Sequence, residues 1–254
     1  MDGIITLIEP LGSDDPAKVH RAQYALQQQI ARVGQPGREG ERAEMARAMA
    51  EQLTAVKEQK DTRGRVTHVP KYPGRVRREV ARWIGYVAGE AQVSALKQAL
   101  QDLDARETAR GSLEQVPGAA ATQALADAAV NGIGTEFRVG VINALGRRQG
   151  ADVVQGLKPC ATDPNLEVRL AAAEALANQA DPSADAAITA AGSVGDEASA
   201  RVARRIGRAR IRLAETLIAA GQKPAGKRIY HSVIAGRTDA TQKKAAQAAL
   251  RQLG

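Results

Sequence analysis

Five arginines near the C-terminal end are the residues whose type and spacing best indicate chemistry. Intervals of one to four residues place them along one side of a helix, opposite an apolar stripe. No aspartate or glutamate occurs from residue 200 to residue 214. Such a row suits phosphates or carboxylates, although a solvated helix face more often has this pattern. The candidate partner-binding residues of this row are Arg201, Arg204, Arg205, Arg208 and Arg212.

A second candidate cluster combines the single tryptophan of the chain with nearby cations. Trp83 and Tyr86 lie three residues apart on a predicted helix that also carries basic residues. Aromatic and basic side chains together can bind a nucleobase and its phosphate. Packing is nevertheless the more common role of tryptophan, and the chain contains only one phenylalanine. This cluster adds the candidate partner-binding residues Arg77, Arg78, Arg82 and Trp83.

The segment 221–227 imitates the start of a phosphate-binding loop. It has a glycine, four further residues and then Gly226 and Lys227. A phosphate-binding loop needs a preceding strand and a following serine or threonine that binds magnesium. Here Arg228 follows, and the preceding residues 214–220 have helical character. We therefore interpret the segment as a turn between two helices.

Metal, disulfide and nucleophile chemistry find no support in the sequence. The three histidines, His20, His68 and His231, are far apart, and none is followed by a glutamate. The single cysteine, Cys160, excludes a disulfide within the chain and a zinc site built on cysteines. No histidine lies near Cys160 in the sequence to activate its thiol. We expect no metal, no cofactor and no catalytic activity.

Composition and charge indicate a basic, all-helical protein. Hydrophobic residues make up 44% of the chain, but aromatic residues only 2%. A core of alanine, leucine, valine and isoleucine suits closely packed helices better than strands. The net charge is +8, and residues 201–254 hold 13 Lys and Arg against 2 Asp and Glu, with a smaller basic region at 61–89. An acidic partner would suit this charge.

Four segments of fourteen residues align without gaps and reveal an internal repeat. They are 76–89, 105–118, 137–150 and 168–181. The second position of every segment is an arginine: Arg77, Arg106, Arg138 and Arg169. The fifth and ninth positions are apolar in all four, so they share one side of a helix. The fifth positions are Val80, Ala109, Val141 and Ala172, and the ninth positions are Ile84, Leu113, Leu145 and Leu176.

Further apolar-periodic stretches lie between these segments, at 91–103, 119–130 and 151–161. Each repeat is therefore expected to be two antiparallel helices joined by a short turn. Neither helix can bury its apolar side alone, so neighbouring repeats must stack. The prediction is an all-α fold, a right-handed α-solenoid of antiparallel helix pairs with a helical hairpin at the C-terminal end.

The run 163–176, Asp-Pro-Asn-Leu-Glu-Val-Arg-Leu-Ala-Ala-Ala-Glu-Ala-Leu, resembles the second helix of a HEAT repeat. The resemblance covers 75–181 and is looser elsewhere. It implies that the arginine column forms a structural ladder with aspartates in neighbouring turns. The expected partners are Asp163 and either Asp102 or Asp104. The resemblance also implies that the second helices line a concave surface on which partners bind.

We predict a single domain over residues 1–254. Its parts are a capping repeat at 1–37, a repeat at 38–89 with a basic loop insertion at 57–75, regular HEAT repeats at 90–181, and basic, partly tetratricopeptide-like helices at 182–254. The insertion carries glycine and proline, and long loops of this kind are functional or disordered. The C-terminal part predicts three helices, at 202–220, 225–235 and 240–253.

These features favour a non-catalytic scaffold that binds a protein partner, expected to be acidic, along a curved repeat surface. The main alternative is a nucleic-acid-binding protein, including a DNA glycosylase of HEAT-like repeats with its site near Trp83. A subunit similar to bilin lyases is a third reading, by fold analogy alone. The first residues do not form a signal peptide, and no stretch is apolar enough to span a membrane. A cytoplasmic protein is therefore expected.

Overall fold

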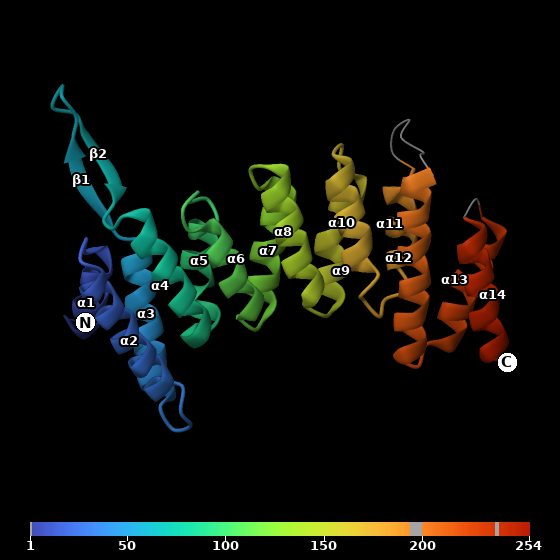
Figure 1. Cartoon of the computed structure of the whole chain (residues 1–254), viewed down its shortest axis with the longest axis horizontal. Helices are drawn as coiled ribbons and strands as arrows, with labels where there is room; N and C mark the ends of the chain where they lie inside the picture. The colour runs from blue at the N-terminus through green and yellow to red at the C-terminus, as the bar shows by residue number, and fades with distance from the viewer. Residues whose placement is uncertain (1, 194–199, 237–238) are drawn as a thin grey trace. The chain divides into compact units, whose positions relative to one another are not determined.

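The computed structural model describes residues 2–193, 200–236 and 239–254 of the chain (Figure 1). Within these ranges the fold is an all-α solenoid, and one two-stranded sheet is its departure from helical structure. The chain divides into two compact units, Met1–Ala124 and Leu125–Gly254. In each unit the helices lie side by side, as the solenoid prediction requires (Figure 1).

The first unit contains the sheet and the N-terminal helices. Its elements are α1 (Asp2–Ile8), η1 (Glu9–Gly12), α2 (Pro16–Val33), α3 (Glu39–Leu53), β1 (Val56–Lys60), β2 (Val66–Pro70), α4 (Gly74–Val87), η2 (Glu90–Gln92), α5 (Val93–Ala99) and α6 (Arg106–Gln115). Helix α4 packs against both α3 and α6. Helix α7 (Ala119–Asn131) begins in this unit and ends in the next.

The second unit continues with helix pairs. Its elements are α8 (Thr135–Arg147), α9 (Ala151–Leu157), η3 (Pro159–Thr162), α10 (Leu166–Leu176), α11 (Ala184–Ala191), α12 (Ala200–Ala219), α13 (Lys223–Ala235) and α14 (Ala240–Gln252). The second helices of consecutive pairs contact one another, α8 with α10 and α10 with α12. The row formed by α8, α10 and α12 positions the site described below.

The aligned apolar columns are the core of the helix pairs. The ninth-position residues have no exposed surface: Ile84, Leu113, Leu145 and Leu176. The fifth-position residues are equally well buried: Val80, Ala109, Val141 and Ala172. The prediction that both columns share the buried side of a helix is confirmed. Burial of these side chains is the main force that holds successive repeats together.

Small residues let neighbouring helices approach closely. A Cβ atom added to Gly146 on α8 would lie 2.6 Å from the Cβ of Ala175 on α10. A Cβ atom added to Gly156 on α9 would lie 2.6 Å from the Cβ of Ala126 on α7. Real Cβ contacts are not this short, so both positions need glycine for the observed packing. This explains why a core with few aromatic residues is well packed.

Residues at the helix ends fix where the helices begin. Asp15, Asn165 and Asp239 precede α2, α10 and α14, and each side chain accepts a hydrogen bond from a backbone N–H in the first turn. Gly134 and Gly150 precede α8 and α9 with φ angles of 90° and 132°. Residues with a Cβ rarely adopt these angles, so glycine is needed at both junctions.

The basic insertion is a β-hairpin where the sequence predicts a loop at 57–75. Strands β1 and β2 pair antiparallel, with Lys60 opposite Val66. The Asp61 carboxylate organises the turn, because one oxygen accepts the N–H groups of Arg63 and Arg65 at 2.8 and 2.9 Å. These backbone hydrogen bonds, that of Arg65 above all, lower the pKa of Asp61. Gly64 completes the turn with a φ of 77°.

The three predicted C-terminal helices are present as α12, α13 and α14. Each begins and ends within two residues of its predicted range. Helix α12 ends at Ala219 and α13 begins at Lys223, so only the start of 221–227 lies in the turn between the helices. Residues 223–227 are already the beginning of α13, and the element before the turn is a helix, as predicted. No helix in the described ranges is both long enough and apolar enough to cross a membrane.

Candidate functional site

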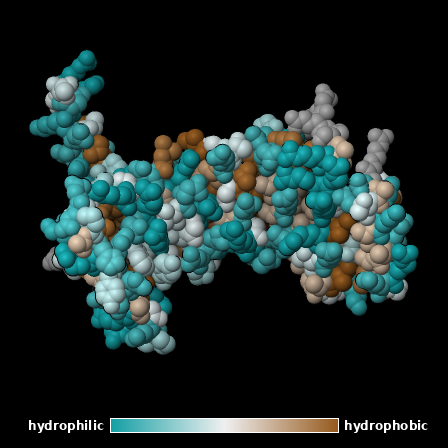
Figure 2. All heavy atoms as spheres, viewed as in Figure 1, coloured by the Kyte–Doolittle hydropathy of each residue, from teal (hydrophilic) through white to brown (hydrophobic). Residues whose placement is uncertain are grey.

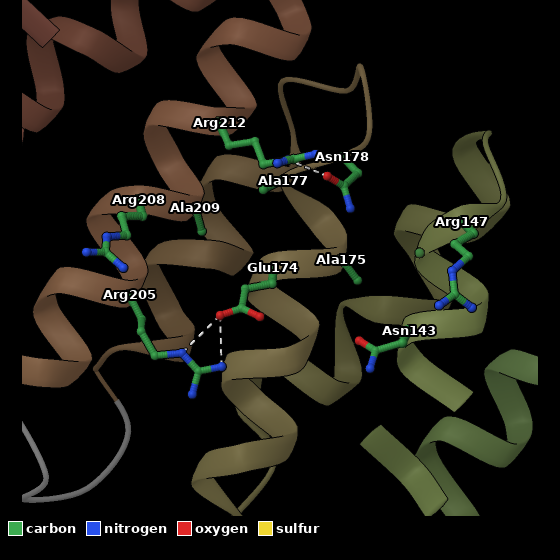
Figure 3. Close-up of a pocket in the computed structure, with 11 residues that line it drawn as sticks. Asn143, Arg147, Glu174, Ala175, Ala177, Asn178, Arg205, Arg208, Ala209 and Arg212 are labelled. Carbon is green, nitrogen blue, oxygen red and sulfur yellow. Dashed lines mark hydrogen bonds and ion pairs between the residues drawn. The ribbon is translucent and has the colours of Figure 1, made fainter. Parts of the chain in front are cut away.

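A basic groove runs across the second helices of three consecutive repeats. Its cavity has a volume of about 600 Å³ and is lined by α8, α10 and α12. Figure 3 shows Asn143 and Arg147 on α8 on one side, α10 in the middle and the arginines of α12 on the other side. Gly146 and Ala175 lie in its lining, so the close approach of α8 and α10 shapes it.

Three of the five predicted arginines of α12 line this groove, and each has a different environment. Arg205 is neutralised, because its guanidinium contacts Glu174 at 2.8 Å and Glu167 at 3.4 Å. Arg212 donates to the neutral amide oxygen of Asn178 at 2.6 Å (Figure 3). Arg208 is exposed, and within the described residues its side chain forms no ion pair or hydrogen bond. Among the residues that the structure describes, Arg208 and Arg212 thus have no carboxylate partner.

The other two arginines of the row do not line the groove. Arg201 is exposed, and its contact with Glu167 is long, at 3.8 Å. Arg204 faces the side of α12 toward Asp239, whose pKa is lowered by the Thr241 backbone N–H and also by the Arg204 charge. Of the five arginines in the predicted row, three therefore line the groove.

Four residues that line the groove are not among the predicted partner-binding residues. They are Asn143, Arg147, Glu174 and Asn178. A signal for them exists in the repeat, because Asn143 and Glu174 both occupy the seventh position of their aligned segments. Arg147 and Asn178 likewise share the eleventh position. These two columns lie on the second helix beside the buried columns, where a solenoid presents its binding surface.

The lining defines what the groove can do. Its charged residues are four arginines and one glutamate, and the remaining members are asparagine, glycine and alanine. None of these lining residues is a histidine, cysteine, serine or aromatic residue. The lining offers guanidinium and amide N–H groups that can donate hydrogen bonds to an anion.

The arginine ladder is structural, as the HEAT resemblance implies. Arg77 binds both carboxylate oxygens of Asp102 and also contacts Asp104 at 3.2 Å. Arg138 forms an ion pair with Asp163. Both pairs join residues 25 apart, an arginine of one repeat and the turn of the next. Arg77, a candidate for partner binding, is thus engaged inside the fold.

Arg169 continues this column with main-chain partners. It is 3% exposed and donates to the carbonyl oxygens of Ala191, Asp163 and Pro164 at 2.8 to 3.2 Å. The guanidinium thereby satisfies carbonyl groups at the ends of neighbouring elements. The column therefore ties repeats together through both carboxylates and backbone.

A further ladder residue, Arg210, was missed from the sequence. It lies on the side of α12 opposite the groove and is buried. Its guanidinium binds the two oxygens of Asp185 at 2.7 and 3.0 Å and the hydroxyl of Ser232 at 2.8 Å. The sequence does place Arg210 on the same side of the helix as the apolar residues Ile206 and Leu213. An arginine on a buried side of a helix needs a partner for its charge, so this position indicates an internal ion pair.

The tryptophan cluster lies on α4 in the first unit. The rings of Trp83 and Tyr86 are 5.7 Å apart and tilted by 44°. Arg82 pairs with Glu79 at 3.2 Å, which the sequence analysis did not single out, and Arg78 is exposed. The Trp83 indole N–H is buried and has no hydrogen-bond partner among the described residues. The structure thus brings a carboxylate, Glu79, to the cluster.

Cys160 is a buried packing residue. Burial raises the pKa of its thiol to about 11, so the thiolate form is scarce at neutral pH. The described residues contain no group of three or more histidine, cysteine, aspartate and glutamate side chains placed to hold a metal ion.

The ladder aspartates have lowered pKa values. Hydrogen bonds from the Arg77 guanidinium lower the pKa of Asp102. Burial by itself would raise the pKa of Asp163, but the Arg138 guanidinium and the Asn165 backbone N–H outweigh it and lower the value. Both carboxylates are therefore held in the charged form by the fold.

Acid should consequently destabilise the chain in a defined range. A carboxylate with a lower pKa in the folded state stabilises the fold above the unfolded value, near 4, and loses this contribution as the pH falls through the folded value. We expect the Tm, followed by far-UV circular dichroism, to fall steeply below about pH 4. Asp163→Asn should have a lower Tm at neutral pH and a shallower loss in acid. Parallel acid profiles of the two proteins would contradict this assignment.

One comparison with known proteins, a match to a family model, agrees with a helical repeat. A family model described as HEAT repeats matches residues 134–209. A search of curated proteins finds no match. Similar solved structures include human deoxyhypusine hydroxylase in complex with glycerol, at 15% identity and a TM-score of 0.38, covering 98% of this chain and 95% of that chain. The complex of CpcE and CpcF of phycocyanin lyase from Nostoc sp. PCC7120 matches at 19% identity and a TM-score of 0.36, covering 89% and 93%.

The family match and the groove coincide. The matched residues begin just before α8 and end within α12, so they include every lining residue of the groove except Arg212. The arginine ladder and the buried columns of the repeat extend beyond them, to Arg77 and Ile84 in the first unit. Residues 134–209 thus match HEAT repeats, and the described part of the chain has the fold of an α-solenoid.

Proposed function

We propose that this chain is a non-catalytic scaffold that binds an acidic polypeptide segment in the groove of α8, α10 and α12. The observation that supports the proposal is the placement of Arg208 and Arg212 in a groove with Glu174 as its single acidic lining residue. Neither arginine has a carboxylate partner in the described part of the chain. Charges left without internal partners on a concave surface are available to a ligand.

An extended peptide suits the groove better than a nucleic acid. Its volume of about 600 Å³ accommodates a few residues of extended chain. The amides of Asn143 and Asn178 can donate to and accept from a peptide backbone. Single-stranded nucleic acid is bound largely by stacking on aromatic side chains, and the groove lining has none.

The test is a binding titration with a fluorescein-labelled peptide of glutamates, followed by fluorescence anisotropy. Arg208→Gln/Arg212→Gln should weaken binding by about 5- to 30-fold, since each of the two lost charge–charge contacts at a partly exposed site contributes roughly 0.5–1 kcal/mol. The matched control is Lys244→Gln/Arg251→Gln, which removes the same charge from exposed positions of α14 in the same unit. Equal weakening by both variants would indicate net charge alone and contradict a specific groove.

A variant that is expected to raise the affinity makes the test independent of folding defects, because a folding defect would only lower it. Glu174→Gln removes the acidic residue of the lining and leaves Arg205 with its longer contact to Glu167 alone, at 3.4 Å. Affinity for the glutamate peptide should then rise, by about threefold. Unchanged or reduced affinity would argue against the groove. If a DNA duplex displaced the peptide and its binding depended on the same arginines, the ligand of the groove would be a nucleic acid and not a peptide.

A further inference from the structure

The β-hairpin of the first unit has no core of its own. All five residues of β1 are exposed, as are four of the five residues of β2. Isolated two-stranded hairpins are at best marginally stable in water, and this one is fixed mainly by its turn and its base. Figure 2 shows the hairpin projecting from the helical body, with hydrophobic side chains where the two meet.

An apolar cavity of about 470 Å³ lies at this base. One wall is the cross-strand pair Val56 and Pro70, and the opposite wall is the turn after α5, which carries Leu103. Val56 is 57% exposed and Leu103 is 74% exposed, so two large apolar side chains face solvent in one cavity. The Arg77–Asp102 pair in the lining is already neutralised. Such a cavity is suited to an apolar side chain from another molecule.

The hairpin that forms one side of the cavity has a net positive charge. Residues 56–71 contain five Lys and Arg but two Asp and Glu, and Asp61 is neutralised by Arg65 within the turn. Within the described residues the side chains of Lys57, Lys60 and Arg63 form no ion pair or hydrogen bond. The lysine that follows Pro70 donates to the neutral amide of Gln52 at 3.3 Å. In the register of the hairpin Lys60 and Glu58 share the face of Val56, and Lys57 lies on the other face. Lys71 directly follows Pro70.

We infer that this hairpin-base cavity binds an acidic polypeptide segment that carries an apolar anchor residue. The cavity between Val56 and Leu103 would take the anchor, and the lysines of the hairpin would contact the acidic residues on either side of it. A nucleic acid backbone has no apolar side chain that could contact Val56 and Leu103, so the apolar walls favour a polypeptide. This site lies in the first unit and requires an apolar residue, so it goes beyond the groove of α8, α10 and α12.

Two labelled peptides of equal length test this inference, one of glutamates alone and one with two leucines among the glutamates. We expect the intact chain to bind the leucine-containing peptide more tightly in an anisotropy titration. Leu103→Ser should remove this preference, weakening the leucine peptide by about tenfold, because the contact of one leucine side chain is lost. The matched control is Ile133→Ser, at a residue 70% exposed and outside the cavity lining.

The outcomes separate this site from the groove. Arg208→Gln/Arg212→Gln should weaken both peptides but retain the preference for leucine, whereas Leu103→Ser should weaken only the leucine peptide. Val56→Thr, which keeps a strand-forming residue on β1, should repeat the Leu103→Ser result. The inference is overturned if the two peptides bind equally, or if Ile133→Ser has the same effect. It is also overturned if Lys57→Gln abolishes binding of a DNA duplex while the leucine preference is absent.

Discussion

Replacing Arg138 with alanine is expected to lower the free energy of unfolding by about 3–5 kcal/mol, as removal of one partner of a buried ion pair does. The side chains of Arg138 and Asp163 are 15% and 11% exposed. Arg138 also donates to the carbonyl oxygen of Ala129 at 2.8 Å, so the change leaves a carbonyl and a buried carboxylate without their partner. Urea denaturation followed by circular dichroism measures the loss.

The control for this variant is an exposed pair of the same kind. Arg47 and Glu51 are 2.8 Å apart on α3, and their side chains are about half exposed. Such pairs contribute about 0.3–0.5 kcal/mol, so Arg47→Ala should scarcely change the urea midpoint. A small effect of Arg138→Ala would contradict the ladder. It would show that burial of the apolar columns holds the repeats together without help from the arginines.

The helix pairs were predictable from the sequence because their physics is local and periodic. A column of apolar residues four apart, such as Val141 and Leu145, can bury itself only on one side of a helix. The repetition of that column in four segments strengthens the inference beyond what one helix allows. The ladder partners Asp102 and Asp163 followed from the family resemblance, and the ion pairs confirm them.

The hairpin could not be read from the sequence in the same way. Successive side chains of its strands point to opposite faces of the sheet, but neither face is buried. Charged and polar side chains therefore occur on both faces, and no alternation of apolar and polar residues marks the strands. The turn signal at Asp61 and Gly64 is clear only once the pairing of Lys60 with Val66 is known. Strand prediction depends on a buried face, and this sheet has none.

The groove is formed by three helices that are distant in the sequence, which explains why only part of its lining was predicted. Helix periodicity placed Arg205, Arg208 and Arg212 on one face of α12, but their neighbours come from two other helices. Which cations lose their charge to a carboxylate depends on contacts such as that of Arg205 with Glu174. Such pairings across repeats are set by packing and cannot be deduced from charge patterns alone.

Arginines two residues apart on α12 should give opposite results when each is replaced by alanine. Arg210→Ala is expected to lower the free energy of unfolding by about 3 kcal/mol, since it leaves the carboxylate of Asp185 without its bidentate partner. Arg208→Ala should change stability by less than about 0.5 kcal/mol, because that side chain is exposed and has no ion pair or hydrogen bond within the described residues.

Binding should show the reverse order. At a temperature where both variants are folded, Arg210→Ala should bind the glutamate peptide as tightly as the unchanged chain, because Arg210 lies opposite the groove. Arg208→Ala should bind it several-fold more weakly, through loss of one charge contact. Urea denaturation and peptide anisotropy on the same two proteins measure both properties. If Arg210→Ala also lost the peptide while folded, the two sides of α12 would not be separate, and the division between ladder and groove would be wrong.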